Sequence, residues 1–91
     1  MDIEVKHDKE NDRFVAEIEG NKAYLSYNVN DDIIDLSYAF TPTELRGKGI
    51  AKIVAEYAFN YAKENNLRVI PSCSYVRAFV ERNENYKDLL A

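Results

Sequence analysis

The feature that most constrains this 91-residue chain is a change in the spacing of its apolar residues near residue 42. Before that point, apolar and polar residues alternate, which is the pattern of strands with one buried face. The pattern predicts four strands with short polar turns between them: Ile3–His7, Arg13–Ile18, Ala23–Val29 and Ile33–Thr41. On the fourth strand the alternation places four residues on one face, namely Ile34, Leu36, Tyr38 and Phe40. Consecutive strands with short turns predict an antiparallel meander.

From residue 50 onward the apolar residues recur every three or four positions, which predicts an amphipathic helix that ends near Asn65 and Asn66. The short apolar run Leu67–Ile70, bounded by Pro71, is typical of a buried strand. A strand that follows a crossover helix lies parallel to the strand before that helix. The fifth strand is therefore expected beside the fourth, in the parallel sense.

A second helix is expected over residues 75–82, with Ser72 or Ser74 as its cap, and the apolar residues of the last nine positions are expected to dock on the core. The fold class is accordingly α+β: a four-stranded antiparallel meander, a helix, a parallel fifth strand and a C-terminal helix. The length and the absence of linkers indicate one domain over residues 1–91.

Composition excludes several classes of function. The net charge is −4, from 12 basic and 16 acidic residues, without the basic face that nucleic-acid binding requires. One cysteine and one histidine make a zinc site of the usual type unexpected, and His7 is interpreted as an exposed strand residue. No apolar run approaches the roughly 18 residues of a membrane span. We expect no metal, no nucleic acid, no membrane and a cytoplasmic setting.

Two glycines and two basic residues, Arg46-Gly47-Lys48-Gly49, stand where the fourth strand leads into the long helix. The first N–H groups of a helix lack internal partners, and the helix dipole there favours negative charge. The segment is thus suited to a phosphate or diphosphate, although a tight turn with surface charges is an equally good interpretation of these residues alone. The spacing fits neither a P-loop nor a dinucleotide-binding loop.

The pattern Arg46-x-x-Gly49-x-Ala51 resembles the Gln/Arg-x-x-Gly-x-Gly/Ala motif of GNAT acetyltransferases. A second cluster, Pro71-x-Cys73-x-Tyr75-Val76, is similar to one that follows the motif in short, standalone GNAT-like proteins. These proteins lack the usual N-terminal helices and C-terminal strands. The resemblance implies a truncated GNAT fold and binding of acetyl-CoA or coenzyme A.

The resemblance also implies which residues bind the cofactor. Its pyrophosphate would lie on the backbone amides of six residues: Arg46, Gly47, Lys48, Gly49, Ile50 and Ala51. Its pantetheine arm would pair like an added strand with the edge formed by Ala39, Phe40 and Thr41. The fourth and fifth strands would separate to admit this arm.

Candidates for catalysis are fewer. Cys73, at the start of the second helix, would accept the acetyl group or contact the thioester, because a helix N-terminus can activate a thiol; a small buried residue at a strand end is the other interpretation. Tyr75 and Tyr38 could protonate a departing thiolate. The short family commonly has a His-Thr pair where this chain has Tyr38-Ala39, and tends to have an aromatic hydroxyl at Phe79.

The predicted function is acetyl-CoA-dependent N-acetyl transfer to a small-molecule or protein amine. The alternatives are a non-catalytic module that binds or senses acyl-CoA, and a structural domain that retains only the fold. The chain is expected to be a monomer or a weak homodimer.

Overall fold

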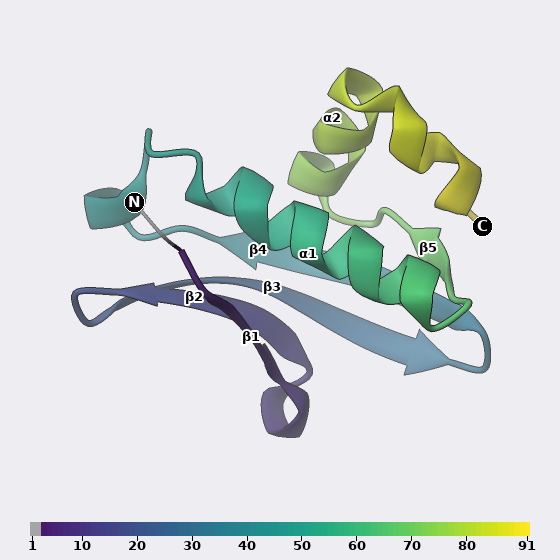
Figure 1. The fold of residues 1–91 in the computed structure, drawn as a ribbon, viewed down its shortest axis with the longest axis horizontal. Coiled ribbons are helices and arrows are strands. Elements are labelled where there is room, and N and C mark those ends of the chain that lie inside the picture. Colours follow the sequence, from purple (N-terminus) through teal and green to yellow (C-terminus); the bar gives the residue numbers. More distant parts are fainter. Residues whose placement is uncertain (1–2) are drawn as a thin grey trace.

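The chain forms one mixed sheet whose five strands lie in sequence order, β1-β2-β3-β4-β5 (Figure 1). In the computed structural model, which describes residues 3–91, the strands are β1 (Val5–Asp8), β2 (Arg13–Ile18), β3 (Asn21–Asn30), β4 (Ile33–Phe40) and β5 (Arg68–Ile70). The first three pairings are antiparallel and the β4–β5 pairing is parallel. The predicted α+β fold with an antiparallel meander and a parallel fifth strand is confirmed.

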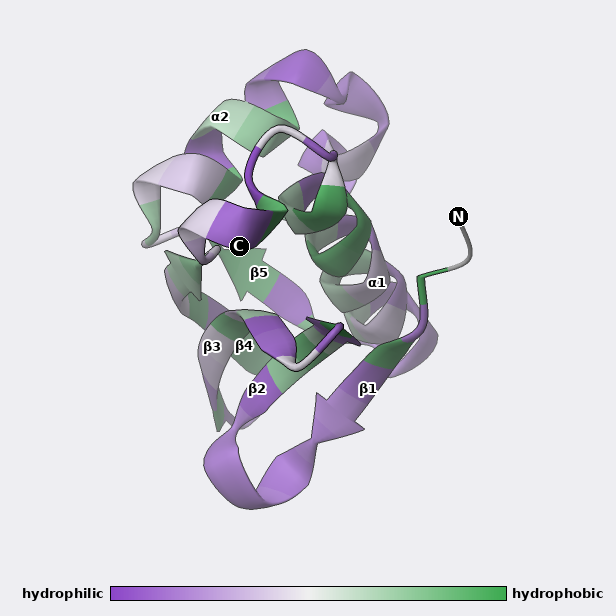
Figure 2. Cartoon of the chain, turned by 90° about the vertical axis from the view of Figure 1, so that its left-hand side faces the viewer, coloured by the Kyte–Doolittle hydropathy of each residue, from purple (hydrophilic) through white to green (hydrophobic). Residues whose placement is uncertain are grey.

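Two helices cover one face of this sheet, and the other face is bare (Figures 1 and 2). Helix α1 (Ile50–Glu64) crosses the sheet, and α2 (Ser74–Arg82) packs beside it. Between the helices and the sheet lies the core, whose largest fully buried side chains are Phe14, Phe59, Ile34, Leu36, Ile50, Val69 and Val76. Burial of this one face is the main stabilising contribution in so small a domain.

The end of α1 and the end of the chain are both fixed by backbone hydrogen bonds. Asn66 adopts the left-handed conformation with φ 56°, as predicted for an asparagine after a helix. The tail docks on the core as expected, and its residue Leu90 forms a parallel bridge with Val69. The Ala91 N–H donates to the Val69 carbonyl at 2.9 Å. The tail therefore covers the outer edge of β5.

A β-bulge interrupts β4 at Ser37. Ser26 pairs with Tyr38, but the next residue, Tyr27, pairs with Leu36, so Ser37 is the extra residue. An extra residue reverses the alternation of side chains beyond it. The prediction that Tyr38 and Phe40 share a face with Ile34 and Leu36 is therefore wrong: Ile34 and Leu36 are buried in the core, whereas Tyr38 and Phe40 are 53% and 39% exposed on the bare face.

Two further predictions are wrong. The N-cap of α2 is Cys73, without a side-chain cap hydrogen bond, so neither Ser72 nor Ser74 caps the helix. His7 is half-buried rather than exposed, and its Nε2 lies 2.6 Å from the Tyr27 hydroxyl oxygen. The rings of Phe14 and Tyr61 shield His7 from solvent, because α1, which carries Tyr61, crosses the sheet above β1.

Helices long and apolar enough to cross a membrane are absent between residues 3 and 91.

We predict that the free energy of unfolding falls as the pH decreases from about 7.5 to about 5.5. Burial is the largest cause that lowers the pKa of His7 below its ordinary 6.5; Lys9 adds to it, and Asp12 and Asp8 oppose it. Protonation is thus less favourable in the folded chain than in the unfolded chain. The stability given by the neutral ring is present above the unfolded pKa and is lost as the pH falls through it.

Urea unfolding at the two pH values measures this change. His7→Phe, which keeps an aromatic ring in the cluster, should flatten the pH dependence. An equally steep dependence in His7→Phe would contradict the assignment.

Candidate anion and cofactor site

The connection between β4 and α1 is anchored by buried side chains at both ends. Leu45, in the 3₁₀ turn Thr43–Leu45, is 2% exposed, and Ile50, the first residue of α1, is 1% exposed. The turn is closed by hydrogen bonds from the N–H groups of Leu45 and Arg46. The short segment between these anchors is held against the core, although its own residues are exposed.

Six consecutive backbone N–H groups at the start of α1 make no hydrogen bond of ordinary geometry within the described chain. They belong to Gly47, Lys48, Gly49, Ile50, Ala51 and Lys52. The first bond of the helix is made only by the Ile53 N–H, which donates to the Gly49 carbonyl at 3.3 Å. Since the Arg46 N–H already donates to Thr43, the free donors begin at Gly47. This run of donors at a helix N-terminus favours a bound anion.

The two glycines shape the loop and leave it open. Gly47 has φ 80° and Gly49 has φ 74°, a left-handed conformation that other residues adopt with strain. A Cβ atom built on either glycine would meet no heavy atom within 4 Å. The space in front of the amides is therefore free for a ligand.

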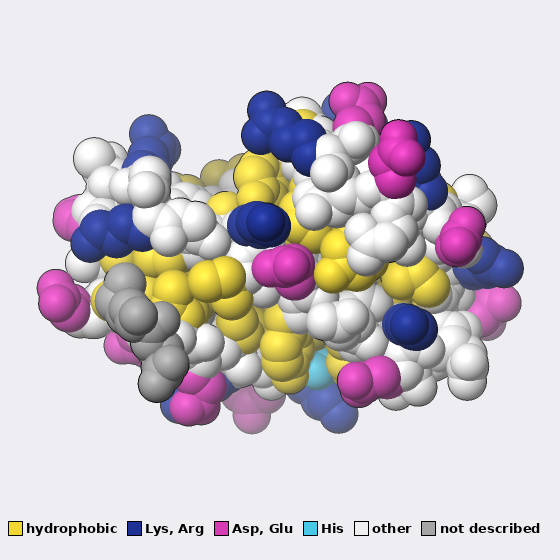
Figure 3. Space-filling model, turned by 45° about the horizontal axis from the view of Figure 1, so that its top comes forward, with side chains coloured by type: hydrophobic (Ala, Val, Ile, Leu, Met, Phe, Trp, Pro, Cys, Tyr) yellow, Lys and Arg dark blue, Asp and Glu magenta, His cyan; other side chains and the backbone are white. Residues whose placement is uncertain are grey.

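The amides border a surface hollow of about 310 Å³. Its lining combines the loop with Thr41 on one side and Tyr75 on the other. A second hollow of only about 10 Å³ continues inward along Ala39, Phe40 and Thr41, and it shares Thr41, Ala51 and Tyr75 with the first. Figure 3 shows Lys and Arg side chains beside exposed hydrophobic side chains at the left-hand end of the molecule, where the loop lies.

All but one of the nine residues predicted to bind the cofactor line one of these two hollows; the exception, Lys48, is exposed. Arg46 has a structural contact as well, because its Nε donates to the Thr41 carbonyl at 3.1 Å. Ile50 is directed into the core, so only its backbone is available to a ligand. Phe40 faces the bare side and packs on Tyr24, with ring centroids 5.5 Å apart.

Strands β4 and β5 separate beside the inner hollow. They pair only from Ile33↔Arg68 to Asp35↔Ile70. Beyond that point the Leu36 carbonyl accepts the Cys73 N–H at 3.0 Å, and the rest of β4 has no strand on this side. The β4 edge near Ala39 is thus free to pair with an extended ligand.

Two of the three candidate catalytic residues lie at the start of α2, beside this separation. Cys73, the N-cap of α2, is partly buried against the core. Tyr75, the second residue of α2, lines both hollows. Burial raises the pKa of the Tyr75 phenol above its ordinary 10.0, and Glu56 and Cys73 raise it further against the opposing effect of Arg82. Tyr75 is therefore a protonated donor at neutral pH.

The other tyrosine candidate lies elsewhere: Tyr38 is on the bare face and lines neither hollow. Phe79 is 4% exposed and stacks on Phe59 and Tyr86 in the core, so its ring has a packing role.

Sequence reasoning missed Lys52 and Leu45, which also line the outer hollow. Lys52 lies in the first turn of the predicted helix, where backbone N–H groups have no partner within the helix, and this position could have identified it. The signal for Leu45 was its place in the run Pro42-x-x-Leu45-x-Gly47-x-Gly49-Ile50-Ala51, which resembles a run of the short GNAT-like proteins, but its burial as an anchor was not predicted.

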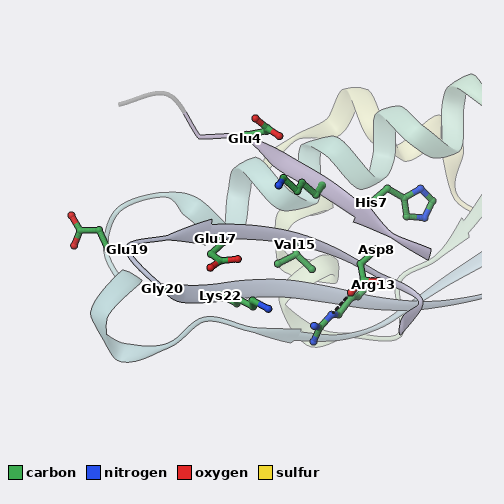
Figure 4. Close-up of a pocket in the computed structure, with 10 residues that line it drawn as sticks. Glu4, His7, Asp8, Arg13, Val15, Glu17, Glu19, Gly20 and Lys22 are labelled. Atoms are coloured by element: carbon green, nitrogen blue, oxygen red, sulfur yellow. Dashed lines mark hydrogen bonds and ion pairs between the residues drawn. The ribbon is translucent and has the colours of Figure 1, made fainter. Parts of the chain in front are cut away.

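A larger hollow, of about 610 Å³, lies on the bare face over β1, β2 and β3 (Figure 4). Its charges are mixed, with Lys6, Arg13 and Lys22 near four acidic residues, and Arg13 is paired with Asp8 at 3.2 Å. None of the residues predicted to bind the cofactor lines it. Across residues 3–91, no group of three or more His, Cys, Asp or Glu side chains could hold a metal ion.

The mixed sheet and the glycine-bearing loop between β4 and α1 define an α+β domain of the truncated GNAT type. The sequence profile described as GCN5-related N-acetyl-transferase matches residues 13–89, and the chain belongs to this family.

Solved and curated relatives agree with this assignment. The chain is 36% identical to the protein NATD1 of Bos taurus and 33% identical to that of Homo sapiens, in each case over 89% of this chain and 74% of the relative. It superposes with a TM-score of 0.76 on the solution structure of a GCN5-like candidate N-acetyltransferase from Staphylococcus aureus, at 28% identity. That match covers 97% of this chain and 87% of the other.

We predict that Gly49→Ala lowers the free energy of unfolding by about 1–2 kcal/mol, because a Cβ atom is strained in the left-handed conformation. Gly20→Ala is the matched control: Gly20 has φ 82°, its Cβ position is equally open, and it lies in the β2–β3 turn and does not line the hollow at the loop. Chemical denaturation should show losses of similar size. If the free energy of unfolding of Gly49→Ala equals that of the wild type, the loop adopts another backbone conformation without cost, and the prediction of strain is wrong.

Proposed function

We propose that this chain binds acetyl-CoA at the start of α1 and transfers the acetyl group to an amine. The observation that carries the proposal is the run of six free N–H donors from Gly47 to Lys52, beside an open hollow of about 310 Å³. Family membership supports acetyltransferase activity, and the geometry of the loop supports a cofactor that carries a diphosphate.

The residues present fit the diphosphate of such a cofactor. Free amides and the positive end of the α1 dipole favour a multiply charged anion. The exposed side chains of Arg46, Lys48 and Lys52 add three positive charges around the amides. Because the two glycines lack Cβ atoms, phosphate oxygens can approach the backbone closely.

The unpaired edge of β4 fits the remainder of the cofactor. An extended chain with amide groups can bind to a free strand edge through main-chain hydrogen bonds. The edge near Ala39 and Thr41 leads from the loop toward Cys73, which stands where β4 and β5 separate. Since the inner hollow measures only about 10 Å³, binding requires the Tyr75 side chain to rotate outward.

Acetyl-CoA, when bound, supplies a thioester whose reaction with an amine forms a C–N bond, breaks the C–S bond and moves one proton from nitrogen to sulfur. Tyr75 lines both hollows and holds a proton at its hydroxyl, whose pKa burial raises above the ordinary 10.0. We assign Tyr75 as the proton donor to the departing sulfur. The Cys73 thiol, two residues earlier, remains the candidate for contact with the thioester.

The second candidate function is binding of acyl-CoA without turnover. One observation favours it. His7, the single histidine, is hydrogen-bonded to Tyr27 within an aromatic cluster and lines neither hollow beside the loop, so this imidazole is not placed to act as a base there. Release of free thiol from acetyl-CoA in the presence of a panel of amines separates the two functions. Stabilisation by the cofactor with no thiol release would support the second.

We predict that acetyl-CoA raises the midpoint of thermal unfolding, since a ligand at about 100 times its dissociation constant adds about 2.7 kcal/mol. Gly49→Ala should reduce this stabilisation, because the added methyl group occupies the space in front of the amides. Gly20→Ala should retain the full stabilisation relative to its own ligand-free midpoint. Equal ligand effects in the two variants would place the cofactor away from the loop.

We predict that Tyr75→Phe lowers kcat by about 10²–10⁴-fold, the usual contribution of a general acid, and leaves the dissociation constant of coenzyme A within about twofold. Tyr57→Phe, which removes another partly exposed hydroxyl but from α1, is the control. Steady-state kinetics and calorimetric titration measure the two quantities. A wild-type kcat in Tyr75→Phe would exclude Tyr75 as the proton donor and leave Cys73 as the remaining candidate for a catalytic residue.

A further inference from the structure

Three aromatic side chains form a patch on the bare face of the sheet, over β3 and β4: Tyr24, Tyr38 and Phe40. The Tyr24 and Phe40 rings have their centroids 5.5 Å apart, and the Tyr24 and Tyr38 rings 6.2 Å apart. The bulge at Ser37 turns Tyr38 and Phe40 to this face, where they are exposed. Contiguous exposed apolar side chains are typical of interaction surfaces. This aromatic patch is therefore a candidate interface.

The hollow of about 610 Å³ lies beside the aromatic patch on the same face. One row of paired residues joins the two, because Lys6 pairs with Val15, Val15 with Tyr24, and Tyr24 with Phe40. Lys6 and Val15 line the hollow, and Figure 4 shows Val15 among the charged side chains that surround it. The hollow thus lies mainly over β1 and β2, and the aromatic patch over β3 and β4.

Two copies of this face are complementary under a twofold rotation. Suppose that two sheets are stacked face to face, with the axis along the strands and between β2 and β3. The rotation then lays β4 of each copy over β1 of the other, and β3 over β2. Each aromatic patch meets the hollow of the other copy, so one contact is made twice, as in the symmetric interface of a homodimer.

The charges around the hollow suit a second copy better than a strongly charged partner. Three basic residues stand among four acidic ones: Lys6, Arg13 and Lys22 beside Glu4, Asp8, Glu17 and Glu19. Stacking two such faces therefore adds little net repulsion and lets opposite charges meet. The Arg13 guanidinium already lies 4.9 Å from the centre of the Tyr24 ring. Under the rotation, Lys6 is placed to make the same kind of cation–π contact with Phe40 of the other copy.

The size of the face sets the strength of the contact. Strand β3 has ten residues, which gives the face a length of roughly 33 Å, and the five strands span a width of roughly 19 Å. Two stacked faces of this size bury at most about 1,200 Å² in total, the lower limit of a standard interface. The contact is therefore expected to be weak, with a dissociation constant on the order of 100 μM.

We propose that the chain forms a weak homodimer in solution through its bare face. The aromatic patch of each copy lies in the hollow over β1 and β2 of the other. Both helices cover the opposite face of the sheet, so they stay on the outer sides of the dimer (Figure 2). The proposal does not rest on the proposed function, and the dimer forms with or without a cofactor.

Sedimentation velocity of the full chain, from about 10 μM to about 1 mM, tests the proposal around the expected dissociation constant. The wild type should change from monomer to dimer across this range. Tyr38→Glu, at an exposed position, should raise the dissociation constant at least about tenfold, because the dimer would bury an added negative charge beside the acidic residues of the hollow. Tyr57→Glu is the matched control: Tyr57 is partly exposed on α1, and this variant should dimerise as the wild type does.

An isotope-filtered NOE experiment identifies the contact in the wild type itself, so its result does not depend on the folding of a variant. In a mixture of ¹³C-labelled and unlabelled chains, the ring protons of Tyr38 and Phe40 should show NOEs to Lys6 and Val15 of the other copy. A wild type that stays monomeric at 1 mM overturns the proposal and leaves the face to a different partner. Equal weakening in Tyr57→Glu, or NOEs only between the two aromatic patches, would also overturn it.

Discussion

The parallel pairing of β4 with β5 ends after three residue pairs, and the candidate site depends on this early separation. Beyond Asp35↔Ile70, β5 gives way to the turn that starts α2. Among residues 3–91, only the Cys73 N–H still bonds to this edge of β4, the edge away from β3. The remaining β4 edge is free, and the bulge at Ser37 reverses which side chains face the core. A longer fifth strand would close this edge and bury the position between the loop and Cys73.

The position of the candidate anion loop, residues 46–51, is a consequence of the same geometry. Strand β4 leads directly into α1, so the free N–H groups of the helix lie at the end of the open edge. The buried side chains of Leu45 and Ile50 hold both ends of the loop, while the glycines keep its surface open. Most of the binding capacity thus belongs to the backbone. A phosphate and an extended arm could be bound along one continuous line from the loop to Cys73.

Much of this arrangement was predictable from sequence, because local patterns determine it. Alternation predicted the strands, and the three-to-four spacing predicted α1. The anion site expected at the glycines and their basic neighbours stays a prediction. The face of Tyr38 was predicted wrongly, since a bulge arises from pairing with β3 and leaves no mark in the β4 sequence. The environment of His7 was also missed, because Phe14 and Tyr61, which shield it, come from other elements.

Binding of the diphosphate of a coenzyme A group by the backbone amides at the start of α1 is tested by an amide ¹H–¹⁵N NMR titration of the chain with coenzyme A. We expect the largest shifts on residues 47–52, with smaller shifts along the β4 edge at residues 38–41. Saturable shifts centred on the bare face over β1 to β3, or no shifts at millimolar coenzyme A, would contradict this expectation.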